Sequence, residues 1–391
     1  MRNRTRTTDP LRLAAVSASM AVLFAASCRR PRRSQPAAVQ ISRATALRLL
    51  RRAALRAGGN SVWVKGSVAG KFPPPRPTDA TEVLTEPRAF SSVFSAVERE
   101  AANLGLKVKS LVGQGPTASL RISEVRTWQT VWQIQEVPRL LRVSIVIDDL
   151  GANDRVVPKL IAIPYPLTFS ILPRLRYSIE TANQAFKAGR EVMLHLPLEP
   201  IARPGIRSSP DEIRVGMSGL AVDRLVQSDL DSIPHVRGVN NHQGSRATSD
   251  PHLMAEVMRQ LAGRHLYFVD SRTIGSSVAW QEARKAGVPA VFRSVFLDDT
   301  ESVSYTVGQL RQLERAVRRQ GVALAIGHPH PTTLRALRDF LPRFAEQNIE
   351  IVPVSYLVRL PETARLYPPR PFHPMAIERR LPARHPTALR H

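Results

Sequence analysis

Hydrophobic runs alternate with amphipathic segments along the central part of the chain. The run VSIVID at 143–148 is largely apolar until its last residue, which is typical of a strand buried on both faces. The same pattern predicts strands at 167–172, 191–195, 236–240, 265–270, 289–292, 322–328 and 350–355. Helices are expected between them at about 153–162, 176–188, 218–232, 250–263, 276–286, 305–320 and 331–347. This alternation indicates an α/β domain with a parallel sheet over residues 142–358.

The ends of these strands favour one arrangement of the sheet. Seven or eight strands, most of them ending in a polar residue, predict a (β/α) barrel with its site at the carboxyl rim. A doubly wound open sheet is the alternative, and it would also place a site at the carboxyl ends of the strands.

A shorter α+β pattern precedes this domain. Apolar residues at helical spacing predict a helix over 87–104, and alternating residues predict strands at 106–112, 117–122 and 127–134. We therefore expect a small α+β domain over residues 80–137. Because it contains no convincing catalytic cluster, we interpret it as a packing or interaction module.

The first 28 residues have the pattern of an export signal. Four arginines precede an apolar run over residues 13–24, and small residues followed by Cys28 close it. The run is too short for a comfortable membrane span. Ala25 to Cys28 also resembles a lipoprotein box, although Ala25 stands where Leu is usual. We expect a periplasmic or cell-envelope location, with lipid anchoring at Cys28 as one option; a disordered N-terminus with a chance apolar run is the alternative.

Positive charge is concentrated at the two ends of the chain. The net charge is +24, and residues 1–60 contribute thirteen arginines against one acid. The segment 29–79 is basic and ends in a proline-rich linker at 71–79, and residues 361–391 form a Pro/Arg-rich tail expected to be disordered. A basic amphipathic helix is expected over 41–56, lying on a membrane surface or packing locally. The arginine bias is also what a GC-rich coding sequence would produce, and no nucleic-acid-binding module accompanies it.

Polar side chains gather at the predicted strand ends. Asp148 and Asp149 end the first strand, where one carboxylate can bind a metal while the other serves as a base, although helix capping is the alternative. His195 ends the third strand, and a neutral imidazole there is a natural ligand for a divalent metal or a hydrogen-bonded structural group. Glu199 lies four residues on, but neighbouring prolines exclude a regular helix.

Later strand ends repeat the pattern. His242 follows the strand at 236–240 and is a candidate ligand, and Arg246 is suited to hold an anionic or carbonyl group or to orient a carboxylate. The segments DSRT at 270–273 and GHPH at 327–330 are similar, and the second contains His328. We therefore expect one polar, metal-binding site at this rim. Substrate contacts are assigned to four further residues, Asn241, Ser245, Asp270 and Arg272.

Together these segments resemble a known family. VSIVIDDLG, ILP at 171–173, AGREVMLHLPLEP, GVNNHQGSRAT, YFVDSRT, VFLDD and LAIGHPHPTTL resemble, in order, the motifs of the divergent polysaccharide deacetylases. The resemblance covers about residues 142–358. It implies a distorted (β/α) barrel related to NodB-type carbohydrate esterases, which remove acetyl groups from N-acetylated sugars with a bound divalent metal, usually zinc.

The resemblance also implies roles for individual residues. Asp148 resembles the catalytic base and Asp149 the first metal ligand. His195 resembles the second ligand, His328 the general acid, and Arg246 the arginine that orients the base.

The third metal ligand is where the sequence departs from the family. The second histidine of the usual His-x-x-x-His motif falls on Glu199. Either Glu199 or His242 supplies the third ligand, and we favour His242 because histidine and aspartate form a more usual zinc set.

These observations favour a metal-dependent deacetylase of an N-acetylated cell-envelope glycan such as peptidoglycan. The alternative is a non-catalytic envelope module that keeps the fold and binds glycan or a partner protein. The basic N-terminus is a possible contact with a membrane surface. Nucleic-acid binding is disfavoured, because the charge lies in the terminal segments behind an export signal.

Overall fold

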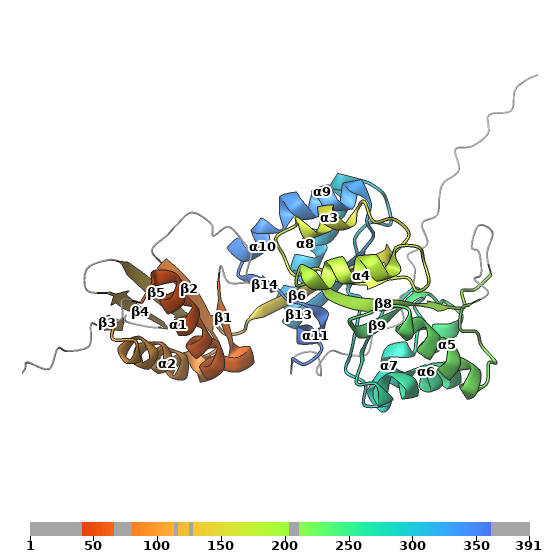
Figure 1. Ribbon diagram of the computed structural model, residues 1–391, viewed down its shortest axis with the longest axis horizontal. Coiled ribbons are helices and arrows are strands. Elements are labelled where there is room, and N and C mark those ends of the chain that lie inside the picture. The colour runs from red at the N-terminus through yellow and green to blue at the C-terminus, as the bar shows by residue number, and fades with distance from the viewer. Residues whose placement is uncertain (1–40, 66–79, 113–115, 125–127, 203–210, 361–391) are drawn as a thin grey trace, which may run out of the picture. The chain divides into compact units, whose positions relative to one another are not determined.

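The structure is a computed structural model that describes residues 41–65, 80–112, 116–124, 128–202 and 211–360 (Figure 1). The expected export signal, Cys28, the linker at 71–79 and the tail at 361–391 lie outside the described residues.

The small α+β domain is built on a five-stranded sheet with the order β1-β2-β5-β4-β3. β2 and β5 pair in parallel, and the other neighbours are antiparallel. Two helices, α1 (Arg43–Gly58) and α2 (Phe90–Asn103), pack against each other. The strands are β1 (Val62–Val64), β2 (Ala80–Thr85), β3 (Lys107–Val112), β4 (Thr117–Ser123) and β5 (Gln129–Glu136). Because β1 pairs with β2, the sheet includes residues before position 80, where the sequence analysis began this domain.

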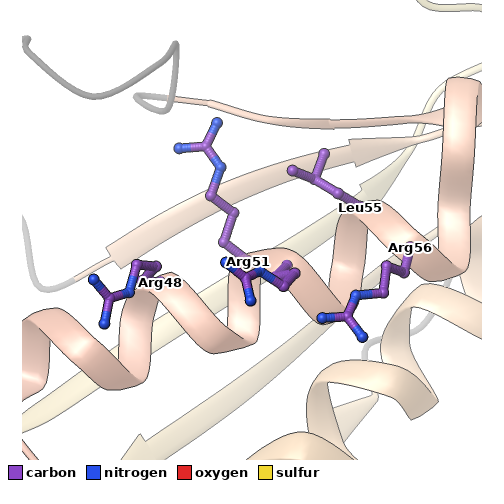
Figure 2. A pocket seen from close by; sticks show the side chains of 5 residues that line it. Arg48, Arg51, Leu55 and Arg56 are labelled. Carbon is purple, nitrogen blue, oxygen red and sulfur yellow. The ribbon is translucent and has the colours of Figure 1, made fainter.

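One-sided burial explains this packing. In β4, Ala118, Leu120 and Ile122 are buried while alternate residues are more exposed, so the strand turns one face to the core. Helix α1 buries Ala46, Leu50 and Ala54 at four-residue spacing, and α2 buries Val93, Val97 and Ala101 in the same way. The opposite face of α1 carries arginines around an open groove (Figure 2).

The second sheet is parallel throughout and has the order β11-β10-β9-β8-β7-β6-β13-β12, with β14 also pairing with β6. With its helices it forms the distorted (β/α) barrel that the sequence predicted, open between the outer strands β11 and β12 of the described sheet. Its strands are β6 (Leu141–Leu150), β7 (Thr168–Ile171), β8 (Glu191–Leu198), β9 (Val236–Gln243), β10 (Tyr267–Asp270), β11 (Ala290–Phe292), β12 (Val295–Phe296), β13 (Val322–Gly327) and β14 (Ile349–Ile351).

All eight expected strands of this domain are present, and the short strand β12 was not predicted. The helices are α3 (Val157–Ile161), α4 (Ser178–Lys187), α5 (Gly219–Asp231), α6 (Pro251–Gly263), α7 (Ala279–Lys285), α8 (Val303–Gln320), α9 (Pro331–Phe340), α10 (Pro342–Glu346) and α11 (Val354–Leu357), with a 3₁₀ turn at Ala247–Ser249. Two further 3₁₀ turns, at Gly59–Ser61 and Pro87–Ala89, belong to the small domain.

Local signals set several helix ends. The Asp250 side chain accepts the Leu253 amide hydrogen and Pro251 occupies the first turn of α6, so this helix begins where its capping residues predict. The helix expected at 331–347 is divided into α9 and α10 at Leu341, directly before Pro342.

Buried strands position the site. Every residue of β13 is buried and β6 is nearly so, and the two strands pair with each other along six residues. Because parallel strands share one carboxyl edge, the polar residues that end them collect there. Among the described helices, none combines the length and apolar character needed to cross a membrane.

Candidate metal centre

Two adjacent aspartates reach the site through a bulge at the end of β6. The register of β6 against β7 shifts between Ile147 and Leu150, and Asp149 has a φ of 57°. A bulge re-aims side chains locally, and aspartate tolerates this left-handed conformation better than most residues. The two carboxylates consequently differ in exposure, at 4% for the Asp148 side chain and 38% for that of Asp149.

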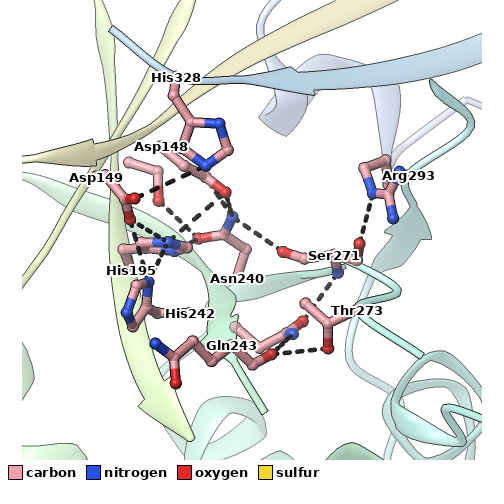
Figure 3. Close-up of polar contacts among 12 residues, drawn as sticks. Asp148, Asp149, His195, Asn240, His242, Gln243, Ser271, Thr273, Arg293 and His328 are labelled. Carbon is pink, nitrogen blue, oxygen red and sulfur yellow. Dashed lines mark hydrogen bonds and ion pairs between the residues drawn. The ribbon is translucent and has the colours of Figure 1, made fainter. Parts of the chain in front are cut away.

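Asp149, His195 and His242 converge on one point (Figure 3). Oδ1 of Asp149 lies 3.1 Å from Nε2 of His195 and 3.1 Å from Nδ1 of His242, and the two ring nitrogens are 3.1 Å apart. The histidines come from the neighbouring strands β8 and β9, in which His195 is registered against Asn240. The barrel therefore gathers three potential metal ligands from strands β6, β8 and β9.

Asn240 determines which nitrogen of His195 carries a proton. Its Nδ2 donates to both oxygens of Asp148, at 2.9 and 3.1 Å, so its Oδ1 is the atom that lies 2.9 Å from Nδ1 of His195. Ser170 also donates to this Oδ1, at 2.6 Å. Nδ1 of His195 must then be a donor, and the neutral ring directs the lone pair of Nε2 toward Asp149.

This donor set fits a divalent metal. The Nε2 lone pair of His195 and a carboxylate oxygen of Asp149 face each other, and a cation between them would satisfy both. Ligand atoms about 2.0–2.2 Å from a tetrahedral zinc ion lie about 3.3 Å from one another, close to the 3.1 Å separations found here. Metal-binding histidines usually donate a hydrogen bond from their other ring nitrogen, which orients the ring, and His195 donates such a bond to Asn240.

Electrostatic interactions link Asp149, His195 and His242, which we call the triad. Burial opposes ionisation of Asp149, but its hydrogen bonds and charge interactions with His195 and His242 outweigh this and hold its pKa well below its usual range. Burial likewise opposes protonation of His195, but Asp148 and Asp149 outweigh it and raise the pKa of that ring. The site is thus negative enough to attract a cation.

Glu199 and Arg246 pair with each other and not with the triad. Nη1 of Arg246 lies 2.9 Å from Oε1 of Glu199, and the Val215 amide donates to Oε2 at 2.9 Å. The Glu199 carbonyl also accepts the amide hydrogens of Arg246 and Ala247. The structure therefore corrects two expectations. Glu199 forms hydrogen bonds that connect neighbouring loops and is not part of the ligand cluster. Arg246 forms its ion pair with Glu199 and not with the candidate base Asp148.

Glu199→Gln is expected to leave metal binding unchanged within about twofold, because no ligand atom is lost. The variant removes a partly exposed ion pair, so the free energy of unfolding should fall by less than about 1 kcal/mol. Elemental analysis and zinc titration calorimetry measure the first effect, and thermal unfolding measures the second. The matched variant His242→Gln should bind zinc far more weakly; a comparable loss in Glu199→Gln would restore Glu199 as a ligand.

Three residues expected to bind substrate form hydrogen bonds within the loops at the rim. Asn241 accepts the Ser271 amide hydrogen and donates to the Gln243 carbonyl, both at 2.8 Å. The Ser245 hydroxyl accepts the Ile201 amide hydrogen at 2.8 Å. Both side chains are therefore engaged in hydrogen bonds to the backbone of the loops, and their assignment to substrate stays a prediction.

Asp270 is the third of them. It is fully buried, accepts the Arg272 amide hydrogen and the Ser277 hydroxyl at 2.8 Å each, and burial raises its pKa. It caps the turn after β10 and is not available to a substrate. Arg272 is partly buried with its guanidinium 5.6 Å from the Phe292 ring centroid, and its φ of 47° is unusual for a residue other than glycine.

His328 forms a dyad with Asp298. Nδ1 of His328 lies 3.0 Å from Oδ1 of Asp298, whose Oδ2 accepts the His328 amide hydrogen at 2.6 Å and the Thr333 hydroxyl at 2.7 Å. Nε2 of the ring lies 3.7 Å from Oδ2 of Asp149. Burial opposes protonation of His328, but Asp298 outweighs it and raises the pKa of the ring. The dyad thus favours the protonated form of the imidazole next to the triad.

Arg293 is the arginine whose charge acts on Asp148. It donates to the Ser271 carbonyl at 2.6 Å and to the Arg272 carbonyl at 2.8 Å. Burial, together with the charge of Arg272, lowers the pKa of Arg293 to about 10, although Asp270, Asp148 and Asp299 oppose that shift. A partly buried cation is therefore held near the candidate base by backbone carbonyls.

Sequence reasoning did not single out Asn240, Asp298 or Arg293. For Asn240, the alternation along the strand was a usable signal, because residues 240 and 242 share one face of β9 while Asn241 points to the other. Asp298 belongs to the segment VFLDD, which was noted but given no role. We find no signal for Arg293, which lies between two very short strands.

Comparisons with known proteins agree with this architecture. The family model for divergent polysaccharide deacetylases matches residues 145–358. The chain is 34% identical over 229 residues to the uncharacterized protein YibQ of Escherichia coli K12, covering 59% of this chain and 71% of that protein. It is 34% identical over 231 residues to an uncharacterized Haemophilus influenzae protein, covering 59% of this chain and 80% of that one.

A solved structure has a similar fold. The crystal structure of an uncharacterized protein from Agrobacterium tumefaciens C58 superposes with a TM-score of 0.54 at 27% identity, covering 56% of this chain and 89% of that chain. The matched region of the family model is the barrel that contains the triad, the bulged aspartates and the histidine dyad. The chain belongs to the divergent polysaccharide deacetylase family.

Proposed function

We propose that this protein is a metal-dependent deacetylase that acts on an N-acetylated polysaccharide of the cell envelope. The observation that supports this most directly is the convergence of Asp149, His195 and His242 beside a buried carboxylate, Asp148, and the ring of His328. Ligands, a base and an acid in one place are what amide hydrolysis needs. The envelope location rests on the sequence pattern of the first 28 residues.

Asp149, His195 and His242 would hold the metal. When bound there, a divalent metal supplies Lewis-acid activation of water and of the acetyl carbonyl. Asn240 keeps the His195 ring in the tautomer that turns Nε2 to the site, because its Oδ1 accepts from Nδ1.

Asp148 is placed to act as the base. Its carboxylate is held by Asn240 through both oxygens, and Oδ2 lies 3.7 Å from Nε2 of His195. It would take a proton from water as the water oxygen attacks the acetyl carbon.

His328 is placed to act as the acid. As the carbon–nitrogen bond breaks, the protonated ring would give its Nε2 proton to the departing nitrogen, leaving acetate and a free amine. Asp298 orients the ring by accepting from Nδ1, so that Nε2 faces the site. Asp298 is therefore a positioning residue and His328 a catalytic one.

The test is to measure metal content and acetate release on the same preparation. We expect about one zinc ion per chain by elemental analysis, and acetate released from chito-oligosaccharides or muropeptides. A preparation that takes up no stoichiometric metal would refute the proposal. Metal uptake and glycan binding without acetate release, unaffected by Asp148→Asn, would instead support the non-catalytic glycan-binding module.

Asp298→Asn is expected to move the alkaline limb of the kcat profile to lower pH. Asp298 raises the pKa of His328 against the effect of burial, so removing its charge lets burial lower that pKa. The acid is active when protonated, and its protonated fraction would then be lost at a lower pH. We expect kcat to fall by about 10²-fold at pH 8 and by less at pH 6. An unchanged alkaline limb would remove Asp298 from this role.

A further inference from the structure

Helix α1 of the small domain presents an uncompensated row of positive charges. It contains five arginines and no acidic residue. Ala46, Leu50 and Ala54 face the core, while Arg48, Arg52 and Arg56 are exposed. The three exposed arginines follow each other at four-residue spacing, so they form one stripe along the helix. We call these three residues the arginine stripe.

The stripe borders an open groove. Arg51 and Leu55 join the three arginines in lining it, and Figure 2 shows Leu55 and the guanidinium groups of Arg48, Arg51 and Arg56 around it. Leu55 is 39% exposed and lies among these charged residues. The groove thus combines cationic groups with an apolar side chain.

No described residue forms an ion pair with the arginine stripe, whereas some exposed arginines on other helices, Arg259 and Arg318 among them, do form one. Arg259 pairs with Glu256, for example. Like charges four residues apart destabilise a helix, so the stripe weakens α1 unless an anionic partner compensates it. The preceding segment, residues 29–40, adds four arginines and no acid.

We propose that the arginine stripe binds the anionic headgroups of a lipid membrane surface. Guanidinium groups form paired hydrogen bonds with phosphate oxygens, and adjacent anionic lipids offer a row of such phosphates. An exposed leucine between the arginines suits the boundary between headgroups and acyl chains. This inference concerns the small domain and does not depend on the chemistry of the barrel.

The composition of α1 favours lipid over nucleic acid. Proteins that bind single strands combine basic grooves with aromatic side chains on which bases stack. Helix α1 has no aromatic residue, and an apolar side chain lines its groove instead. Charge complementarity together with Leu55 therefore points to a lipid surface.

The experiment is co-sedimentation of the full chain with vesicles of phosphatidylcholine alone or with 30 mol% phosphatidylglycerol. We compare the partition coefficient for vesicles with phosphatidylglycerol to that for phosphatidylcholine alone. This ratio isolates the electrostatic contribution to binding, because an apolar segment of the chain would bind both kinds of vesicle equally. We expect Arg48→Gln/Arg52→Gln/Arg56→Gln to lower this ratio about a hundredfold, or about fivefold per arginine. Lysine at the same three positions should retain most of the binding, and 0.5 M salt should weaken it.

The chain offers a matched control on another helix. Arg311, Arg315 and Arg319 of α8 are exposed at the same four-residue spacing, so their replacement by glutamine removes the same charge. This control should lower the ratio by less than about threefold. An equal loss in both triple variants, with circular dichroism showing both folded, would overturn the proposal. So would tighter binding of the wild type to a DNA oligonucleotide than to phosphatidylglycerol vesicles at 0.15 M salt.

Discussion

Asp148→Asn is expected to reduce kcat/KM for acetate release by about 10²–10⁴-fold while zinc content stays at one per chain. Asparagine has the size of aspartate but cannot take a proton from water. Asp148 is not a member of the ligand triad, since the converging atoms belong to Asp149, His195 and His242. The variant can still hydrogen-bond to Asn240, because an amide oxygen accepts from Nδ2. The barrel should therefore remain folded, and the loss should appear in catalysis alone.

The neighbouring position supplies the matched control for this prediction. Asp149→Asn makes the same chemical change one residue later, and there we expect zinc content itself to fall. Elemental analysis and single-substrate kinetics on both variants separate a base from a ligand. If Asp148→Asn lost zinc as well, Asp148 would belong among the ligands; activity within tenfold of wild type would exclude it as the base.

His195→Gln should weaken zinc binding by more than about a hundredfold and abolish acetate release. A loss of about a hundredfold is the upper range when a residue that only supports a ligand is removed, and loss of the ligand itself should exceed it. His195 is buried, and its Nε2 faces Asp149 and His242. Bound metal also stabilises the fold, by about 2.7 kcal/mol at a free concentration one hundred times Kd. Chelation should therefore lower the Tm of the wild type but leave that of His195→Gln unchanged.

His252→Gln is the control for the loss of a histidine. His252 is exposed in the first turn of α6 and forms no part of the triad, so its variant should keep the zinc content and the response to chelator. Calorimetry with zinc and thermal unfolding with and without chelator make the measurement. A wild type that is insensitive to chelator, despite bound zinc, would contradict a metal held by the core strands.

Much of the barrel and part of its site were determined by local sequence pattern. Buried strands and amphipathic helices have different periods, so their alternation over 142–358 specified the elements and the α/β class. Asp149, His195 and His242 were identified because each lies at a strand end, and parallel strands gather their ends at one edge. Those inferences needed only residue type and position along the chain.

The tertiary structure separated His242 from Glu199 as the third candidate ligand and brought the supporting residues to the site. Glu199 lies four residues after His195, yet it is used by Arg246 and Val215 from other loops. Asn240 bonds to Asp148, which is 92 positions away, and His328 to Asp298, which is 30 away. Such partnerships depend on strand order and on the choice between competing hydrogen bonds. The spacing of apolar residues along the chain specifies neither of these.

In the small domain, too, the sequence determined some features and the tertiary structure determined others. Its helix at 90–103 and its three later strands follow from local pattern, but the membership of β1 in the sheet depends on pairing with β2 across an intervening segment. Sequence alone predicted a basic amphipathic helix over 41–56, and α1 spans Arg43–Gly58. Only packing decided that Ala46, Leu50 and Ala54 face the core, because their burial required a partner helix and left the arginine stripe to solvent.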